Sequence, residues 1–273
     1  MIVTDMEGVA GILNHDDWVM RAGRFFAKGQ RLLTHEVNAA VDGLFKGGAT
    51  EVVVLDGHGQ GGIDPELLDE RAELQRGYAG GNPWPLGLDS DYDGVGFVGQ
   101  HAKAGTDYSH ITHTQWFSYI DLAINGVSIG EYGQIALCAM EIGVPTILAC
   151  GEEALCREAE ALTPGVVTVS VKRGLRLDGL DDLDTDQYAA AKLAAIHFSP
   201  TRSRRLIREG ALEAARRLKQ GGESFHYPEL ARPYIRTARF RKSGDKPAWT
   251  ARDEHQDSII ALMNMPFTDV AGA

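Results

Sequence analysis

Short apolar runs alternate with helical stretches along most of the chain, and this order constrains the fold more than any other feature. Residues 51–56 (Glu-Val-Val-Val-Leu-Asp) are apolar without alternation, which is typical of a strand that helices cover on both faces. Residues 24–46 carry apolar side chains at steps of three and four, which predicts a helix. Further strands are predicted at 1–4, 94–99 and 145–149, and further helices at 65–74, 131–142 and 154–162. This order predicts an α/β fold with a mainly parallel central sheet flanked by helices.

The later segments predict a smaller addition to this core. Residues 119–129 have the pattern of a hairpin with a type I′ turn at Asn125 and Gly126. Ser199 and Pro200 are the residue types that begin a helix, and a helix is predicted from there to residue 219. An exposed acidic loop is predicted at 177–187 and a final helix at 257–263. We expect the chain to have two parts. Residues 1–175 form an α/β core, and residues 176–273 form the rest of the core plus a smaller α+β substructure.

Composition and charge exclude several classes of protein. The net charge of −11 over 273 residues argues against a general surface for nucleic acid or anionic membranes. No apolar run reaches the roughly 18 residues of a membrane helix, and no signal-peptide pattern precedes the first strand. The three cysteines are odd in number and lack close pairing, which predicts reduced thiols. We therefore expect a cytoplasmic protein with neither a nucleic-acid nor a membrane partner.

Polar side chains follow three of the predicted strands. Asp5 and Glu7 come after the first strand, two residues apart, so that both can face one point. His58 follows the second strand and His101 follows the third. The carboxyl ends of parallel strands lie at one edge of a sheet, where open α/β folds build their sites, so we expect these four side chains to converge. One acidic pair or one histidine would be an ordinary surface feature, but this recurrence indicates a metal site.

Glu131 is a fifth candidate ligand, between the hairpin and the next helix. Its position alone favours a simpler role, as a carboxylate that the helix dipole stabilises. Two divalent cations carry about four positive charges; Asp5, Glu7 and Glu131 would balance three of them, and a hydroxide the fourth. Mixed imidazole and carboxylate ligands suit zinc, with manganese or cobalt as alternatives.

Two further histidines, His110 and His113, lie after the third strand and could transfer protons near the metals. Their spacing does not choose between them. The glycine-rich segment 57–62 lacks the Gly-Lys-Ser/Thr ending of a phosphate-binding loop and the spacing of a dinucleotide-binding motif. Close approach of the backbone to a metal site explains its glycines more simply than a nucleotide site does.

Together, these motifs resemble the D-aminopeptidase family of dinuclear zinc metallopeptidases. The matching motifs occur in the family's order across residues 2–172: Asp-Met-Glu-Gly at 5–8, Leu-Thr-His-Glu-Val-Asn at 33–38, Asp-Gly-His at 56–58, His-Ala-Lys-Ala-Gly at 101–105, Thr-His-Thr at 112–114 and Gly-Glu-Tyr-Gly at 130–133. As a set, motifs of this length in this order are specific.

The resemblance implies a residue set and an activity. It implies that the metal ligands are Asp5, Glu7, His58, His101 and Glu131, with Asp5 as a bridge between two divalent metal ions, taken to be zinc. It also implies that His113 is the catalytic histidine. The expected activity is removal of the N-terminal residue of short peptides, including D-alanyl peptides, by a metal-activated water assisted by this histidine. The resemblance further implies a homo-oligomer, expected to be a decamer-like ring, because the characterised type of this family forms a ring.

Two other functions use the same residues. A two-metal amidohydrolase or phosphoesterase could hold its metals with this ligand set and act on another small substrate. A non-catalytic metal- or peptide-binding scaffold could retain the ligands for stability alone. A closed structural zinc site is less suited to the set, because such sites favour cysteine-rich ligands and three of these ligands are carboxylates.

Overall fold

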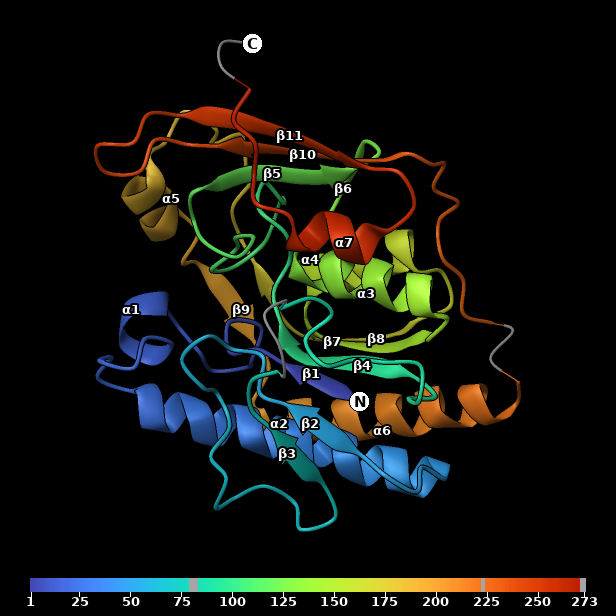
Figure 1. The fold of residues 1–273 in the computed structure, drawn as a ribbon. Coiled ribbons are helices and arrows are strands. Elements are labelled where there is room, and N and C mark those ends of the chain that lie inside the picture. Colours follow the sequence, from blue (N-terminus) through green and yellow to red (C-terminus); the bar gives the residue numbers. More distant parts are fainter. Residues whose placement is uncertain (79–82, 222–223, 271–273) are drawn as a thin grey trace.

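A mainly parallel sheet forms the centre of the protein, with helices on both faces (Figure 1). The computed structural model describes residues 1–78, 83–221 and 224–270. Within these residues the sheet has seven strands in the order β3-β2-β1-β4-β7-β8-β9, and all neighbours are parallel except β8 and β9. Its strands are β1 (Ile2–Thr4), β2 (Val53–Leu55), β3 (Glu73–Gln75), β4 (Val95–Gln100), β7 (Thr146–Glu152), β8 (Val167–Gly174) and β9 (Ala195–His197). The predicted α/β fold class is confirmed.

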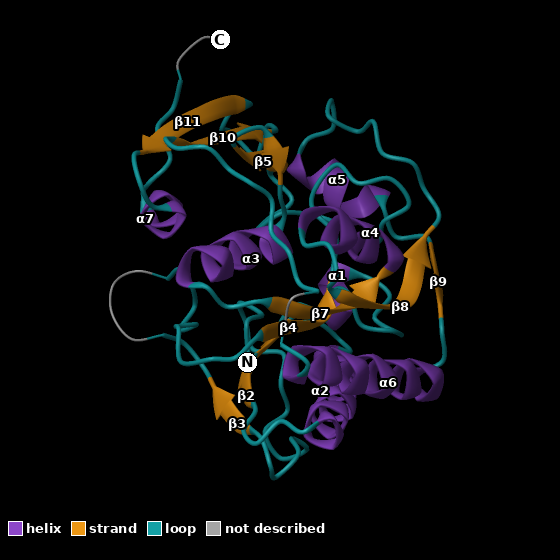
Figure 2. Ribbon diagram, turned by 90° about the vertical axis from the view of Figure 1, so that its right-hand side faces the viewer, coloured by secondary structure: helices purple, strands orange, loops and turns teal. Residues whose placement is uncertain are grey.

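Four long helices cover the two faces of this sheet. On one face α2 (Phe26–Gly47) and α6 (Pro200–Lys219) lie side by side, and on the other lie α3 (Glu131–Ile142) and α4 (Glu153–Leu162) (Figures 1 and 2). Buried apolar side chains form a separate cluster on each face. Burial from both sides explains why the central strands are apolar without alternation. Within the described residues, none of the helices combines the length and the apolar composition of a membrane span.

A second, antiparallel sheet lies beyond α3, away from the large sheet (Figure 2). Its strand order in the described chain is β11-β10-β5-β6, with β5 (Tyr119–Ile124), β6 (Val127–Ser128), β10 (Tyr234–Phe240) and β11 (Trp249–His255). Positive φ angles at Asn125 (50°) and Gly126 (80°) are those of the predicted type I′ turn. Helix α7 (Ile259–Asn264) packs against α3 and this sheet. The boundary near residue 175 stays a prediction, since the small sheet takes strands from both sides of it.

The predicted helix at 65–74 is wrong. This segment forms turns and then β3, because polar side chains bind the backbone groups that a helix would use. Asp64 and Asp69 each accept a hydrogen bond, at 3.1 Å, from the backbone N–H two residues further on. Asn38 of α2 donates to the carbonyl oxygen of Leu67 at 2.7 Å.

The acidic segment 177–187 is only partly the exposed loop that its composition predicts. The side chain of Asp178 is buried and pairs with the buried ammonium of Lys192 at 2.5 Å. Helix α5 (Thr185–Ala191) begins within the segment, with Asp184 as its N-cap. The remaining element, α1 (His15–Trp18), is a single turn in the loop after β1.

Candidate metal centre

The carboxyl ends of β1, β2 and β4 bring polar side chains to one edge of the large sheet. β1 lies between the other two strands and pairs with both in parallel. Asp5 comes directly after β1, His101 directly after β4, and His58 a few residues after β2. The parallel order therefore places these side chains next to one another, as the sequence predicts.

Two glycines allow the chain at this edge to pack more closely than other residues would. A Cβ atom on Gly99, whose φ is +79°, would lie 2.0 Å from the carbonyl oxygen of Asp5. A Cβ atom on Gly8 would lie 2.0 Å from the carbonyl oxygen of Gln100. A side chain at either position would push apart the ends of β1 and β4, and with them Asp5 and His101.

The carboxylate of Asp5 lies between two histidines. Its Oδ1 is 3.2 Å from His58 Nδ1, and its Oδ2 is 3.3 Å from His101 Nε2. The backbone N–H of Met6 donates to Oδ1 and the side-chain amide of Gln100 donates to Oδ2, each at 2.9 Å. These hydrogen bonds hold the carboxylate so that one oxygen faces each histidine, and Asp5 could therefore contribute to both halves of a two-metal site.

Glu7 and His58 complete one half of the site with Asp5. The three residues offer ligand atoms that all lie within 4.8 Å of one another. Glu7 Oε2 is 3.5 Å from His58 Nδ1, and within the described residues this buried oxygen has no hydrogen-bond partner. His58 Nε2 lies 3.3 Å from the carbonyl oxygen of Val19 and donates its proton there. A metal ion would bind the other ring nitrogen, Nδ1, which faces the two carboxylates.

His101, His113 and Glu131 form the other half, again with ligand atoms within 4.8 Å of one another. His101 Nδ1 donates to the carbonyl oxygen of Ala102 at 2.8 Å, so Nε2 is the ring nitrogen that faces the site. This Nε2 is 3.4 Å from Glu131 Oε1 and has no hydrogen-bond partner in the described chain. Glu131, the first residue of α3, accepts a hydrogen bond from the backbone N–H of Gln115 at 2.7 Å.

His113, and not His110, faces the carboxylates. His113 Nδ1 donates to a backbone carbonyl at 2.9 Å, and its Nε2 lies 3.9 Å from Glu7 Oε1 and 3.8 Å from Glu131 Oε1. Its ring stacks on that of His101, with the centroids 4.0 Å apart. The ring of His110 instead accepts a hydrogen bond from Lys172 Nζ at 3.0 Å. Burial and the Lys172 charge lower the pKa of His110 to about 2, so it is a neutral structural histidine.

The electrostatics of the site favour added positive charge. Burial and the neighbouring charge of Glu7 raise the pKa of Asp5 to about 7. Burial opposes protonation of His58, yet the charges of Glu7 and Asp5 raise its pKa to about 9. Burial and the charge of His101 lower the pKa of His113 to about 4. Buried carboxylates that draw protons onto their neighbours would also draw metal cations.

The donor set fits a pair of divalent metal ions. Ligands placed tetrahedrally at about 2.0–2.1 Å from zinc lie about 3.3 Å apart. The carboxylate oxygens of Asp5, Glu7 and Glu131 lie 3.2–3.5 Å from the facing nitrogens of His58 and His101. Among the described residues, two of these buried atoms, on Glu7 and His101, lack any hydrogen-bond partner. Buried polar atoms are rarely left unpaired, so their arrangement supports a ligand between them.

Gln100 and Gln115 belong to this site, although the sequence alone does not single them out. Gln100 orients Asp5 through its side-chain amide. Gln100 ends β4 and directly precedes His101, and this position in the sequence could have indicated its role. Gln115 binds Glu131 through its backbone N–H, from a conformation with φ of 60°. A contact made by a backbone N–H does not depend on the type of side chain, so no sequence pattern predicts it.

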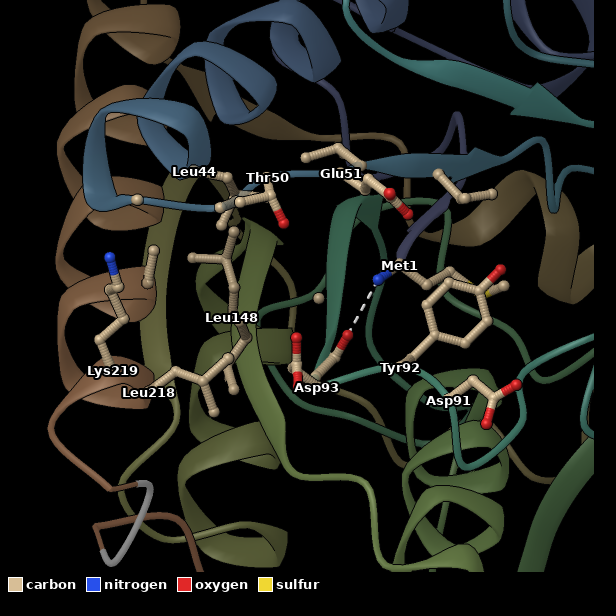
Figure 3. Close-up of a pocket in the computed structure, with 18 of the residues that line it drawn as sticks. Met1, Leu44, Thr50, Glu51, Asp91, Tyr92, Asp93, Leu148, Leu218 and Lys219 are labelled. Atoms are coloured by element: carbon tan, nitrogen blue, oxygen red, sulfur yellow. Dashed lines mark hydrogen bonds between the residues drawn. The ribbon is translucent and has the colours of Figure 1, made fainter.

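A cavity of about 680 Å³ opens at the opposite edge of the sheet and is separate from the metal centre (Figure 3). The amino ends of β1, β2, β4 and β7 line it, with Met1, Glu51, Asp93 and Lys219 among its side chains. Open α/β sheets bind ligands at the carboxyl ends of their strands. The cluster around Asp5 is therefore the better candidate for the functional site.

Comparison with known proteins agrees with this choice. Residues 1–247 match the model of a peptidase family described as D-aminopeptidase. The chain belongs to the D-aminopeptidase family. It is 34% identical to a D-aminopeptidase of Bacillus subtilis (strain 168) over 170 residues, which are 62% of this chain and 61% of that relative. The matched region thus spans less than two thirds of the relative's length.

A solved structure shares the whole fold. It is that of the zinc-dependent D-aminopeptidase DppA from Bacillus subtilis, described as a self-compartmentalizing protease. The TM-score is 0.77 with 23% sequence identity, over 96% of this chain and 94% of that one. The structural match thus covers a larger share of the chain than the 62% that is similar in sequence to the relative above.

Proposed function

We propose that this protein is a zinc-dependent aminopeptidase that removes the N-terminal residue of short peptides, including peptides that begin with D-alanine. The observation that carries the proposal is the convergence of Asp5 with four other candidate ligand side chains, with His113 Nε2 facing the same space. Membership of the D-aminopeptidase family and the fold shared with a zinc-dependent member support it.

Two sets of residues would hold the metals, with Asp5 common to both. Glu7 and His58 would complete one set, and His101 and Glu131 the other. Zinc bound there would polarise the peptide carbonyl and lower the pKa of a water molecule from about 15.7 toward about 7. The side chain of Glu131 is 21% exposed, against 8% for Asp5 and 3% for Glu7. We infer that substrate enters beside Glu131 and that this carboxylate helps to hold its free amino group.

His113 would transfer the proton. Its Nδ1–H donates to the carbonyl oxygen of Ile111, which leaves the lone pair on Nε2 inside the site. Nε2 can then accept a proton from the attacking water and pass it to the departing amine. Packing on Phe117, with ring centroids 4.5 Å apart, and on His101 fixes the ring for this role.

A panel of D- and L-dipeptides and aminoacyl amides, tested against zinc-loaded protein, examines this proposal. We expect turnover of peptides with a free amino end and none of their N-acetylated forms. His113→Ala is expected to keep both metals and to lose turnover by about 10²–10⁴-fold. Near-full turnover in that variant would exclude a catalytic role for His113. Hydrolysis of phosphomonoesters alone would exclude the peptidase.

We also infer that the protein forms a ring-shaped homo-oligomer, similar to a decamer, in the cytoplasm. Exposed apolar side chains gather on neighbouring segments around β9, namely Leu175, Leu177, Leu193 and Ile196. Surfaces of this kind commonly form subunit contacts. The unpaired state of the three cysteines supports a reducing compartment. Light scattering coupled to size-exclusion chromatography measures the assembly, and a monomer at micromolar concentration would contradict it.

A further inference from the structure

Glu152 binds two of the loops that build the metal centre. It is the last residue of β7, is fully buried, and lies opposite Lys172 of the neighbouring strand. One carboxylate oxygen accepts hydrogen bonds from the backbone N–H of Ala102 at 2.8 Å and from the hydroxyl of Thr112 at 3.2 Å. The other accepts from the backbone N–H of His110 at 2.7 Å. Both carboxylate oxygens are therefore occupied by donors from the segment 102–112.

These partners are the immediate neighbours of site residues. Ala102 follows His101, and Thr112 precedes His113. One carboxylate therefore joins the segments that carry the two stacked histidines, whose ring centroids lie 4.0 Å apart. Backbone groups bound to one rigid, buried anion leave little freedom to the side chains beside them.

Glu158, on the following helix α4, makes the corresponding link to Glu131. One of its oxygens accepts from the backbone N–H of Lys103 at 2.8 Å, and the other from the backbone N–H of Gly130 at 3.1 Å. Gly130 directly precedes Glu131, and a Cβ atom on it would lie 2.7 Å from Lys103 Cβ. The two chain segments therefore cross in contact, and the carboxylate holds them together.

The two halves of the site differ in how they are held. Asp5, Glu7 and His58 follow strands that are hydrogen-bonded to each other along their length. His113 lies in a loop and Glu131 begins a helix, so sheet pairing does not set their distance from His101. Glu152 and Glu158 make contacts that sheet pairing does not make. They join the segment after His101 to the segment before His113 and to the residue before Glu131.

We propose that Glu152 and Glu158 are positioning residues that hold His101, His113 and Glu131 together as one half of the metal centre. Neither carboxylate faces the metal space, because both are occupied by backbone and hydroxyl donors. The proposal rests on the proposed function for its turnover measurement, and its metal-binding measurement is independent of any substrate.

The test compares Glu152→Gln and Glu158→Gln with a control variant at an exposed carboxylate that makes the same kinds of hydrogen bond away from the metal centre. In either variant the new amide group directs a donor at a backbone N–H and so breaks one link. Glu141→Gln is the control, because Glu141 also accepts from two backbone N–H groups and a hydroxyl, at the start of α7. Titration of zinc against a chromophoric chelator is expected to show binding about 10–100-fold weaker in both test variants. The control should bind zinc within about 2-fold of wild type, and equal affinity in all three variants would overturn the proposal.

Turnover measured at saturating zinc distinguishes the role of Glu152 from that of Glu158. Glu158→Gln should regain most of its kcat, since excess zinc restores the arrangement of His101 and Glu131. Glu152→Gln should keep a lower kcat with unchanged KM, because the segment before His113 remains loose. If Glu152→Gln does not fold, Thr112→Val tests the same link: a reduced kcat supports it, and a wild-type kcat overturns it. Should the wild type bind zinc but hydrolyse no peptide, the proposed function fails while zinc affinity still decides the positioning role.

Discussion

The buried carboxyl group of Glu36 tests how strongly the interior of the protein disfavours a negative charge. It lies on α2 and is 2% exposed, and one of its oxygens accepts a hydrogen bond from the backbone N–H of Ala10 at 3.2 Å. Within the described residues the other oxygen has no hydrogen-bond partner. Burial raises the pKa of this carboxyl from 4.5 to about 8, although the charges of Lys172 and Arg204 oppose the shift.

The raised pKa makes stability depend on pH. The folded protein holds the proton more tightly than the unfolded chain, so this contribution is full below pH 4.5 and is lost as pH rises to about 8. At about 1.4 kcal/mol per pH unit, the loss over the whole interval is at most about 5 kcal/mol. Between pH 5.5 and 7.5 it amounts to about 2–3 kcal/mol.

Glu36→Gln removes this dependence without a large change of shape. Urea unfolding of wild type and variant at several pH values, with a chelator present throughout, gives the difference in their free energies of unfolding. The chelator removes the pH dependence of metal binding, and titrating groups that do not interact with Glu36 cancel in the difference. The variant should gain about 2–3 kcal/mol relative to wild type between pH 5.5 and 7.5. A difference that is constant within about 0.5 kcal/mol would refute a raised pKa at Glu36.

Two further predictions concern metal removal and the small sheet. Chelation should abolish peptide hydrolysis and lower the unfolding temperature, because each zinc ion present at 1,000 times its Kd stabilises the folded state by about 4 kcal/mol. Calorimetry on the chelated protein, before and after zinc is restored, measures this change. An unchanged unfolding temperature would count against stabilisation of the fold by metal. Arg236→Met should lower the free energy of unfolding in urea by about 3–5 kcal/mol. In the wild type the buried carboxylate of Asp253 lies 2.7 Å from the guanidinium of Arg236, and the variant leaves this carboxylate without its partner. The same variant should keep wild-type zinc affinity, and a loss below about 1 kcal/mol would show that the pair is dispensable.

Much of the fold could be predicted because its signals are local. Apolar runs such as 51–56 are buried from both sides wherever they occur in a parallel sheet, and Ser199 caps α6 through a hydrogen bond from Arg202 N, three residues away. The segment 65–74 shows where local signals fail. Its helical spacing is overridden by Asn38, a residue of α2 far away in the chain, and by its own aspartates.

The same division applies to the metal centre. The order of motifs along the chain was enough to predict that Asp5, His58 and His101 converge, because each follows a predicted strand and the carboxyl ends of parallel strands lie at one edge of a sheet. The spacing of His110 and His113 did not choose between them, although the family resemblance favoured His113. The tertiary structure shows that His113, and not His110, faces the carboxylates, because their rings point in different directions. It also decided that Glu152 and Glu158 hold the loops. Their partners are mainly backbone N–H groups of distant segments, and every residue except proline carries that donor, so the contacts exist only once the chain has folded.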